Sequence, residues 1–151
     1  MIEVKNLNKS FGNFKSLDNL SLNVKKGSVY GLVGPNGAGK TTFIKNLMGI
    51  YRPDSGSMTV NGEEVYENPA LKQKIIYISD DLFFFTTYSI LDTAKLYADI
   101  YKDWDWETFN KLKEIFKIDV KRKCCRLSKG MQKQVAFWLG ICTKPDLMVL
   151  D

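Results

Sequence analysis

The sequence contains no histidine among its 151 residues. This absence excludes Ser-His-Asp hydrolysis, imidazole general-base chemistry and metal sites built from histidine. Cysteine is also scarce: Cys124 and Cys125 are adjacent, and Cys142 is the third. Three cysteines in this arrangement suggest neither a disulfide framework nor a four-ligand zinc site. We therefore expect reduced thiols with a structural role.

Long apolar runs are missing as well. No stretch approaches the roughly 20 residues needed to cross a bilayer, and the N-terminus lacks the pattern of a signal peptide. Hydrophobic residues make up 44% and charged residues 26%, which is typical of a soluble globular domain in the cytosol. The net charge is +5, and many basic residues lie between Lys111 and Lys133. A basic face there can meet nucleic acid, anionic lipid or a partner's phosphates, although a solvated helix surface is the commoner explanation.

The most specific pattern spans residues 34–42, which read Gly-Pro-Asn-Gly-Ala-Gly-Lys-Thr-Thr and are called the glycine loop below. Gly34 and Gly39, followed by Lys40 and Thr41, match the phosphate-binding P-loop pattern. Glycines let successive backbone amides point at one anion, and a helix start adds a positive partial charge. Lys40 is expected to reach the outer phosphates of a nucleotide, and the Thr41 hydroxyl to bind Mg²⁺. The alternative is a glycine-rich turn that only caps a helix.

The chain around this loop predicts alternating strands and helices. Alternating or compact apolar runs predict strands at residues 2–7, 20–24, 29–33, 58–60 and 75–78. Residues 42–48 predict a helix that Gly49 ends, and Asn61-Gly62 predicts a tight hairpin turn. The three phenylalanines at 83–85 cannot all face one core from a regular strand, so at least one is expected to be exposed or buried in a partner.

Three further helices are predicted to form an insert over residues 88–142. Ser89 and Asp92 form a capping box for a helix through Tyr101, a second helix starts at Asp105, and Ser128 caps a third. The apolar residues 147–150 suit a strand buried on both faces of a parallel sheet. Asp151 then lies at the carboxyl end of that strand, where open α/β sheets bind ligands.

Three motifs in this order resemble the nucleotide-binding subunit of ATP-binding cassette (ABC) transporters. The glycine loop resembles its Walker A motif, residues 127–131 (Leu-Ser-Lys-Gly-Met) its signature motif, and residues 147–151 its Walker B strand. The resemblance implies an α/β fold, with a P-loop NTPase core of mainly parallel sheet, an N-terminal antiparallel β subdomain and a helical insert. It divides the chain into residues 1–87, 88–142 and 143–151, with the domain incomplete at its C-terminus.

The resemblance also implies a site for ATP and Mg²⁺. It implies that Phe11 is the aromatic residue that stacks on adenine. It also implies that Asp151 and Thr41 bind the metal ion. Asp80 is a weaker candidate that would reach Mg²⁺ through water. The implied nucleotide-binding residues are Phe11, Gly34, Asn36, Gly37, Ala38, Gly39, Lys40, Thr41, Thr42, Ser128 and Gly130.

In this family two such subunits pack head to tail, so that the signature of one closes over the ATP of the other. They drive a transmembrane permease from the cytoplasmic face of the membrane, and no direct contact with nucleic acid is implied. The soluble ABC-type ATPases that act on nucleic acid or ribosomes are the alternative. A GTPase is a third hypothesis, because residues 143–146 superficially resemble a guanine-reading motif, but here they precede an apolar strand.

The sequence departs from the family pattern at three places. Lys129 and Met131 replace the usual glycine and glutamine of the signature, and Asp80-Asp81 stand where a glutamine is usual. The catalytic glutamate that follows the Walker B aspartate and the later switch histidine are absent. We therefore expect an N-terminal part of a longer ATPase that is not hydrolytically competent alone and tends to oligomerise through an exposed strand edge.

Overall fold

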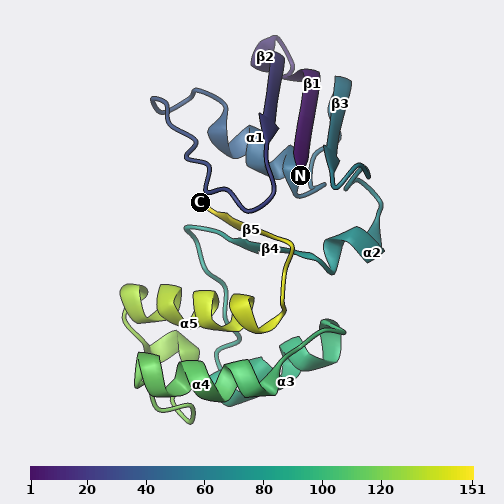
Figure 1. Cartoon of the computed structure of the whole chain (residues 1–151). Helices are drawn as coiled ribbons and strands as arrows, with labels where there is room; N and C mark the ends of the chain where they lie inside the picture. Colours follow the sequence, from purple (N-terminus) through teal and green to yellow (C-terminus); the bar gives the residue numbers. More distant parts are fainter. The chain divides into compact units, whose positions relative to one another are not determined.

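A computed structural model describes residues 1–151, which form two compact units, Met1–Lys72 and Gln73–Asp151. Figure 1 shows the strands and helices of each unit. The predicted division at residues 87 and 142 stays a prediction. The two units are described in turn.

The first unit is built on a three-stranded antiparallel sheet in the order β2-β1-β3 (Figure 1). The strands are β1 (Ile2–Phe11), β2 (Phe14–Val24) and β3 (Ser55–Val60). Val4 pairs with Leu22 on one side and with Met58 on the other, so the predicted alternation of apolar residues places a common face toward the core. The predicted antiparallel N-terminal subdomain is present.

Helix α1 (Lys40–Leu47) contributes Phe43, Ile44 and Leu47 to the buried apolar residues of this unit. It ends where the sequence predicts, because Gly49 adopts φ 63 and its amide donates to the carbonyl of Asn46 at 2.9 Å. A short helix, α2 (Pro69–Lys72), completes the unit.

One strand prediction in this unit is wrong. Residues 29–33 form no strand, and the side chains of Val29 and Val33 are fully exposed. No strand of either sheet pairs with this run, and a β-favouring run forms a strand only where a neighbour pairs with it. The Asn61-Gly62 turn does form, with φ 53 and 86, but only one bridge, from Val60 to Glu63, follows it.

The second unit contains a parallel pair of strands, β4 (Ile75–Ile78) and β5 (Leu147–Leu150), with Ile75 opposite Leu147 and Ile78 opposite Leu150. The predicted strand at 147–150 is therefore confirmed. Its burial on both faces is wrong: its residues are half-buried, and Leu150 is 59% exposed. The reason is that β5 has a neighbouring strand on one edge only.

The rest of the second unit is helical: α3 (Ile90–Ile100), α4 (Trp106–Phe116), a 3₁₀ turn η1 (Cys124–Arg126) and α5 (Lys129–Cys142). The predicted caps Ser89 and Ser128 are confirmed, since their side chains accept backbone N–H groups at the starts of α3 and α5. The helix predicted from Asp105 is also present, and the Asp105 side chain caps it. None of the helices has the length and apolarity needed to cross a membrane.

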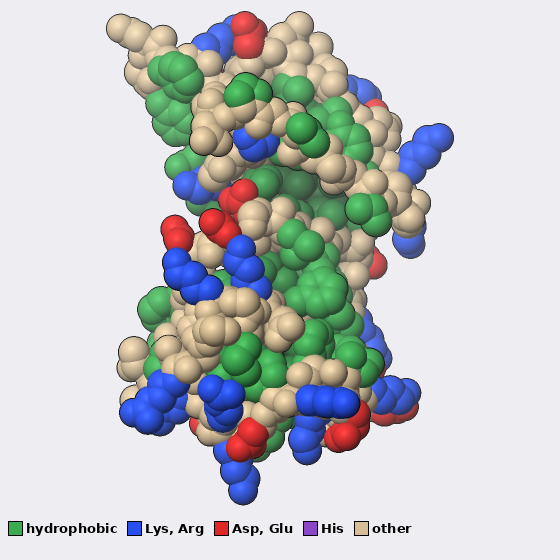
Figure 2. Space-filling view, turned by 90° about the vertical axis from the view of Figure 1, so that its left-hand side faces the viewer, with side chains coloured by type: hydrophobic (Ala, Val, Ile, Leu, Met, Phe, Trp, Pro, Cys, Tyr) green, Lys and Arg blue, Asp and Glu red, His purple; other side chains and the backbone are tan.

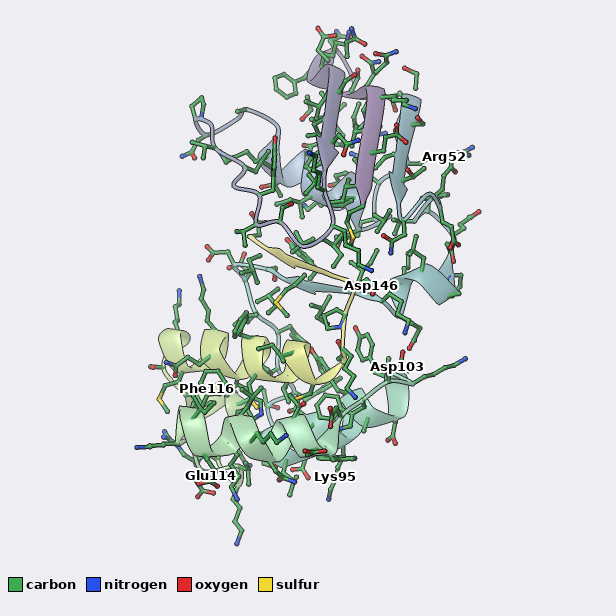
Figure 3. All side chains as sticks on the ribbon, viewed as in Figure 1. Arg52, Lys95, Asp103, Glu114, Phe116 and Asp146 are labelled. Atoms are coloured by element: carbon green, nitrogen blue, oxygen red, sulfur yellow. The ribbon has the colours of Figure 1, made fainter.

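Trp138 on α5 is at the centre of the helical core. Its ring stacks on Phe109 at 4.6 Å and on Phe116 at 5.7 Å, and its indole N–H donates to the carbonyl of Phe109 at 3.1 Å. Figure 3 labels Phe116 near the end of α4. Cys124 and Cys142 are buried in this core, and all three cysteines are free thiols, as predicted.

Candidate functional site

The glycine loop is exposed from Gly34 to Ala38 and leads directly into α1. Gly37 and Gly39 both have φ 84, a left-handed conformation that favours glycine. A Cβ at Gly39 would lie 2.4 Å from the carbonyl oxygen of Ser16 on β2, so the backbone approaches closely there. Glycine at position 39 is therefore required both by its conformation and by its contact with β2.

Helix α1 begins differently from the other long helices of the chain. Its N-cap is Gly39, and no side chain accepts the amides of its first turn, whereas α3, α4 and α5 are capped by Ser89, Asp105 and Ser128. Uncapped first-turn N–H groups and the helix dipole together favour a bound anion. The start of α1 and the exposed loop before it thus form an anion-binding geometry.

The side chain of Lys40 lies across the glycine loop. Its Nζ donates to the carbonyl of Gly34 at 2.6 Å and to that of Pro35 at 2.9 Å. An ammonium group has three donors, so one N–H remains for a phosphate oxygen. The Lys40 ammonium therefore lies at the glycine loop, where the predicted contact with a phosphate requires it to be.

The two threonines after Lys40 have different surroundings. Thr41 is exposed, and its hydroxyl makes no hydrogen bond within the chain, so it is available to a metal ion. The Thr42 hydroxyl accepts a hydrogen bond from Ser16 Oγ at 2.8 Å. Ser16 thus donates to Thr42, and its carbonyl lies close to the backbone of Gly39, but no motif in the sequence marks it. Asn36 and Ala38 are exposed on the same loop.

Phe11 lies at the end of β1 in the same unit and is 44% exposed. Tyr51 contacts its ring edge-on at 5.4 Å between ring centroids, and the Lys9 ammonium lies 5.7 Å from the ring centre. Part of the ring remains open to a planar ligand. The stacking role of Phe11 stays a prediction.

In the second unit the two predicted carboxylates follow neighbouring parallel strands. Asp151 directly follows β5, its amide donates to the carbonyl of Ile78 at 3.0 Å, and its carboxylate accepts from Tyr77 Oη at 3.0 Å. Burial, with a smaller contribution from Asp151, raises the pKa of Tyr77 to about 12, so this tyrosine remains a donor at neutral pH. Asp80 lies beyond the end of β4, at the same edge of the sheet.

Asp80 is already paired. Lys133 on α5 places its Nζ 2.6 Å from Asp80 Oδ1, and this hydrogen bond lowers the pKa of the carboxyl group. Sequence reasoning missed both Tyr77 and Lys133, although Lys133 lies one helical turn after Lys129 in the helix that Ser128 caps. At the carboxyl ends of β4 and β5, the Asp151 carboxylate therefore accepts a hydrogen bond from the neutral Tyr77 hydroxyl, and the Asp80 carboxylate is paired with the Lys133 ammonium.

No group of three or more His, Cys, Asp or Glu side chains forms a complete metal site in the chain. Mg²⁺ that binds with a nucleotide keeps several waters and takes one or two protein ligands in addition to phosphate oxygens. The oxygen ligands that the sequence offers, the Thr41 hydroxyl and the Asp151 carboxylate, are of the chemical kind that Mg²⁺ prefers.

The signature residues form the start of α5. Ser128 accepts the amide of Met131 at 3.3 Å, so the hydroxyl caps its own helix. Ser128, Lys129 and Gly130 are exposed, and a Cβ added at Gly130 would meet no heavy atom within 4 Å. This helix start presents an open surface that another molecule can approach.

Comparisons with known proteins show the family of this chain. The family model described as "ABC transporter" matches residues 17–151. The chain is 33% identical over 151 residues to the ABC transporter ATP-binding protein YtrB of Bacillus subtilis, covering 100% of this chain and 52% of that protein. It is 35% identical over 159 residues to an uncharacterized ABC transporter ATP-binding protein of Methanocaldococcus jannaschii, covering 99% of this chain and 55% of that protein.

Among solved structures, one described as the ATP-binding subunit of an ABC transporter superposes with a TM-score of 0.90, covering 100% of this chain and 65% of that one at 24% identity. This likeness confirms the predicted fold class, an α/β P-loop NTPase with an antiparallel β-sheet and a helical part. The chain spans about half the length of the two curated relatives. The chain thus belongs to the ABC transporter family, as part of its ATP-binding domain.

Proposed function

We propose that this chain is part of an energy-coupling subunit that binds ATP with Mg²⁺ and, as the whole protein, hydrolyses ATP to drive a membrane partner. The observation that carries this proposal is the uncapped start of α1 behind the exposed glycine loop, with Lys40 held across it. Free amides, a helix dipole and one ammonium converge there, which suits a triphosphate. Asn36, Gly37, Ala38 and Thr42 complete the loop that would surround it.

The metal is proposed to bind beside the phosphates. Thr41 offers a free hydroxyl and Asp151 a carboxylate, while Asp80 would act through a water molecule. When bound, Mg²⁺ would neutralise charge on the phosphate oxygens. No residue of this chain is proposed as the general base that activates water.

A second copy of the subunit is the first proposed partner. Ser128 and Gly130 at the open start of α5 would face the γ-phosphate of an ATP held by the glycine loop of the other copy. The exposed surface around Gly130 supports this role, because no side chain of the chain occupies it. Ser128 can cap α5 through one lone pair and still accept or donate a further hydrogen bond.

A transmembrane permease is the second proposed partner, which would place the protein at the cytoplasmic face of a membrane. Phe83 and Phe85 are 80% and 49% exposed, and Phe84 packs on the helical core, so the prediction that this triplet cannot be fully buried is confirmed. Exposed neighbouring aromatics mark an interface. The ring of Phe85 lies 5.0 Å from that of Tyr88, which also lines a pocket on α3.

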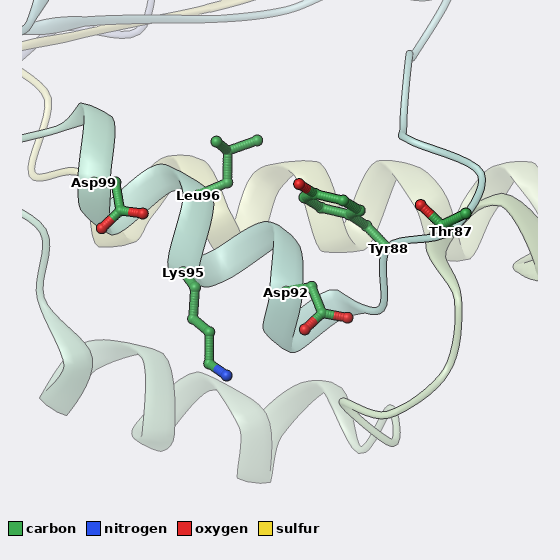
Figure 4. A pocket seen from close by; sticks show the side chains of 6 residues that line it. All are labelled: Thr87, Tyr88, Asp92, Lys95, Leu96 and Asp99. Atoms are coloured by element: carbon green, nitrogen blue, oxygen red, sulfur yellow. The ribbon is translucent and has the colours of Figure 1, made fainter.

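That pocket has a volume of about 410 Å³ and is lined by residues of α3 and of the segment that enters it (Figure 4). The lining residues are Thr87, Tyr88, Asp92, Lys95, Leu96 and Asp99. None of them belongs to the predicted nucleotide site. Through Tyr88, the pocket adjoins the exposed phenylalanines that are proposed to meet the permease.

The comparisons give no support to the alternative of a soluble ATPase that acts on nucleic acid or ribosomes. The YtrB relative and the family model both carry the transporter description. The transported substance and the direction of transport are left open by the residues of the chain.

Nucleotide titration with and without Mg²⁺ tests the proposal. Lys40→Ala removes a charge-assisted contact to phosphate, so we expect ATP binding to weaken about 10- to 100-fold. Lys45→Ala is the matched control, because Lys45 lies on the same helix and faces the ring of Tyr51. Equal ATP affinity of the Lys40→Ala variant and the unchanged protein would refute the role of the glycine loop.

A further inference from the structure

The segment that joins α4 to α5 carries positive charge that the chain does not neutralise. Residues 117–126, called the basic loop, contain one acidic residue, Asp119, and five exposed cations. These are Lys117, Lys121, Arg122, Lys123 and Arg126. None of the five forms an ion pair within the chain, whereas Lys111 and Lys133 on the flanking helices are paired with Glu107 and Asp80.

The one carboxylate of the basic loop does not offset these charges. Asp119 Oδ1 accepts the backbone amide of Lys121 at 3.0 Å, so the side chain holds the turn and pairs with no ammonium or guanidinium group. Like charges this close in sequence repel one another. An anionic partner would relieve that repulsion.

The backbone of the basic loop is fixed, so the cations project from an ordered base. The amides of Ile90 and Leu91 in the first turn of α3 donate to the carbonyls of Arg122 and Val120 at 3.1 and 3.0 Å. The amide of Cys124 donates to the carbonyl of Tyr88 at 3.2 Å. Because Ile118 and Cys124 are also buried, this segment is a surface with a defined place in the second unit.

The basic loop is joined to the segment that holds the exposed phenylalanines. Cys125 Sγ donates to the carbonyl of Thr86 at 3.3 Å, and Lys123 forms a bridge with Ser89. Figure 2 shows many Lys and Arg side chains over the lower, helical part of the face it presents, with fewer acidic ones. The cations therefore lie beside the surface proposed to meet the membrane partner.

The chemistry of the basic loop favours lipid headgroups over nucleic acid. Three of its five cations are lysines, which act as point charges and suit dispersed anions, while arginine is preferred for bidentate recognition. Residues 117–126 contain no aromatic side chain on which a base can stack. Basic clusters next to a membrane attract the anionic lipids of its cytoplasmic leaflet.

We infer that the basic loop contacts the anionic phospholipid headgroups of the bilayer that holds the membrane partner. This contact would orient the helical part of the subunit toward the membrane independently of nucleotide. The inference depends on one part of the proposed function, which is that Phe83 and Phe85 contact a membrane partner.

Vesicle co-sedimentation of the purified protein, without permease or nucleotide, tests the inference. The vesicles contain phosphatidylcholine alone or an equal mixture with phosphatidylglycerol. We expect binding to the mixed vesicles only, weakened by salt. The variant K121Q/R122Q/K123Q should bind about 100-fold more weakly, at about fivefold per charge. The matched variant K25Q/K26Q/K102Q removes three exposed charges elsewhere and should bind within about twofold of the unchanged protein.

Several outcomes would overturn the inference. These are equal binding to phosphatidylcholine alone, salt-independent binding, or an equal loss in the matched variant. Binding of a single-stranded DNA oligonucleotide in place of the mixed vesicles would assign the surface to nucleic acid and overturn it as well. ATP titration of the same samples separates the two proposals, because failure of vesicle binding leaves ATP affinity unchanged, whereas failure of ATP binding overturns the proposed function alone.

Discussion

The Nζ of Lys133 lies 2.6 Å from Asp80 Oδ1, which connects α5, the helix of the signature residues, to the segment after β4. Asp80, together with Asp81, stands where the family pattern has a glutamine. Both side chains are exposed, so the contact is worth little as a contribution to stability. Its effect is expected on the proposed metal site, because the ion pair with Lys133 would withhold the Asp80 carboxylate from a water on Mg²⁺.

Removing the ammonium of Lys133 is therefore expected to strengthen Mg²⁺-dependent nucleotide binding. Lys133→Met should increase the affinity for Mg²⁺-ATP about threefold, since Asp80 is released from its ion pair. Titration in the Asp80→Asn background is the control, because the gain should vanish there. The same gain in both backgrounds would show that Asp80 has no part in the metal site.

Glycine at position 39 makes two separable contributions, and alanine substitutions measure both. Gly37→Ala introduces only the left-handed strain of about 1 kcal/mol, because no heavy atom lies within 4 Å of the added Cβ. Gly39→Ala adds a collision with the backbone of Ser16 at 2.4 Å, so we expect a larger loss of unfolding free energy and loss of ATP binding. Denaturant unfolding and ATP titration check this. Equal unfolding free energies in the two variants would contradict the observed contact.

The exposed phenylalanines give a prediction about the membrane partner. Phe83→Asp in the whole protein should weaken its assembly with the permease about 30-fold, as for an aromatic residue central to an interface. Phe14→Asp, at a position 60% exposed in the first unit, is the matched control and should assemble normally. Co-purification and permease-coupled ATPase activity measure the effect. Normal assembly of the Phe83→Asp variant would exclude this surface.

Stability is expected to fall above pH 9 because of the buried thiol of Cys142. Burial raises the pKa of Cys142 from 9.0 to about 12, so the folded chain holds its proton where the unfolded chain releases it. The stabilisation is complete below pH 9 and is lost as the pH rises toward 12, by at most about 1.4 kcal/mol per pH unit. Urea unfolding at pH 8 to 11 should show a steeper decline in the unchanged protein than in Cys142→Ala. Parallel declines would contradict the buried, neutral thiol.

Local signals in the sequence predicted the helices and the glycine loop well. Ser89, Asp105 and Ser128 cap helices through bonds to their own first turns, so the information lies within three residues of each cap. The loop pattern at 34–41 likewise fixes the backbone through its own glycines. Alternation of apolar residues located β1, because one face of it is buried.

Predictions that depended on distant neighbours were less successful. The run at 29–33 has strand-forming residues, but a strand forms only where another strand pairs with it. The residues of the run do not show whether such a partner strand exists. The same holds for the burial of 147–150. Ser16, Tyr77 and Lys133 are polar residues whose partners lie 26, 74 and 53 positions away, so only the folded chain shows their contacts. Fold class was thus easier to predict than the surroundings of the site.

The absence of a side-chain cap at Gly39 has a consequence for local motion. At α3, α4 and α5 a hydroxyl or carboxylate accepts hydrogen bonds from amides of the first turn. The first turn of α1 has no such side-chain hydrogen bond. Its amides at Thr41 and Thr42 should therefore take up deuterium faster than those of the other helix starts. A phosphate that accepts hydrogen bonds from these amides would slow their deuterium uptake. The exchange rate of this one turn would therefore show whether nucleotide is bound.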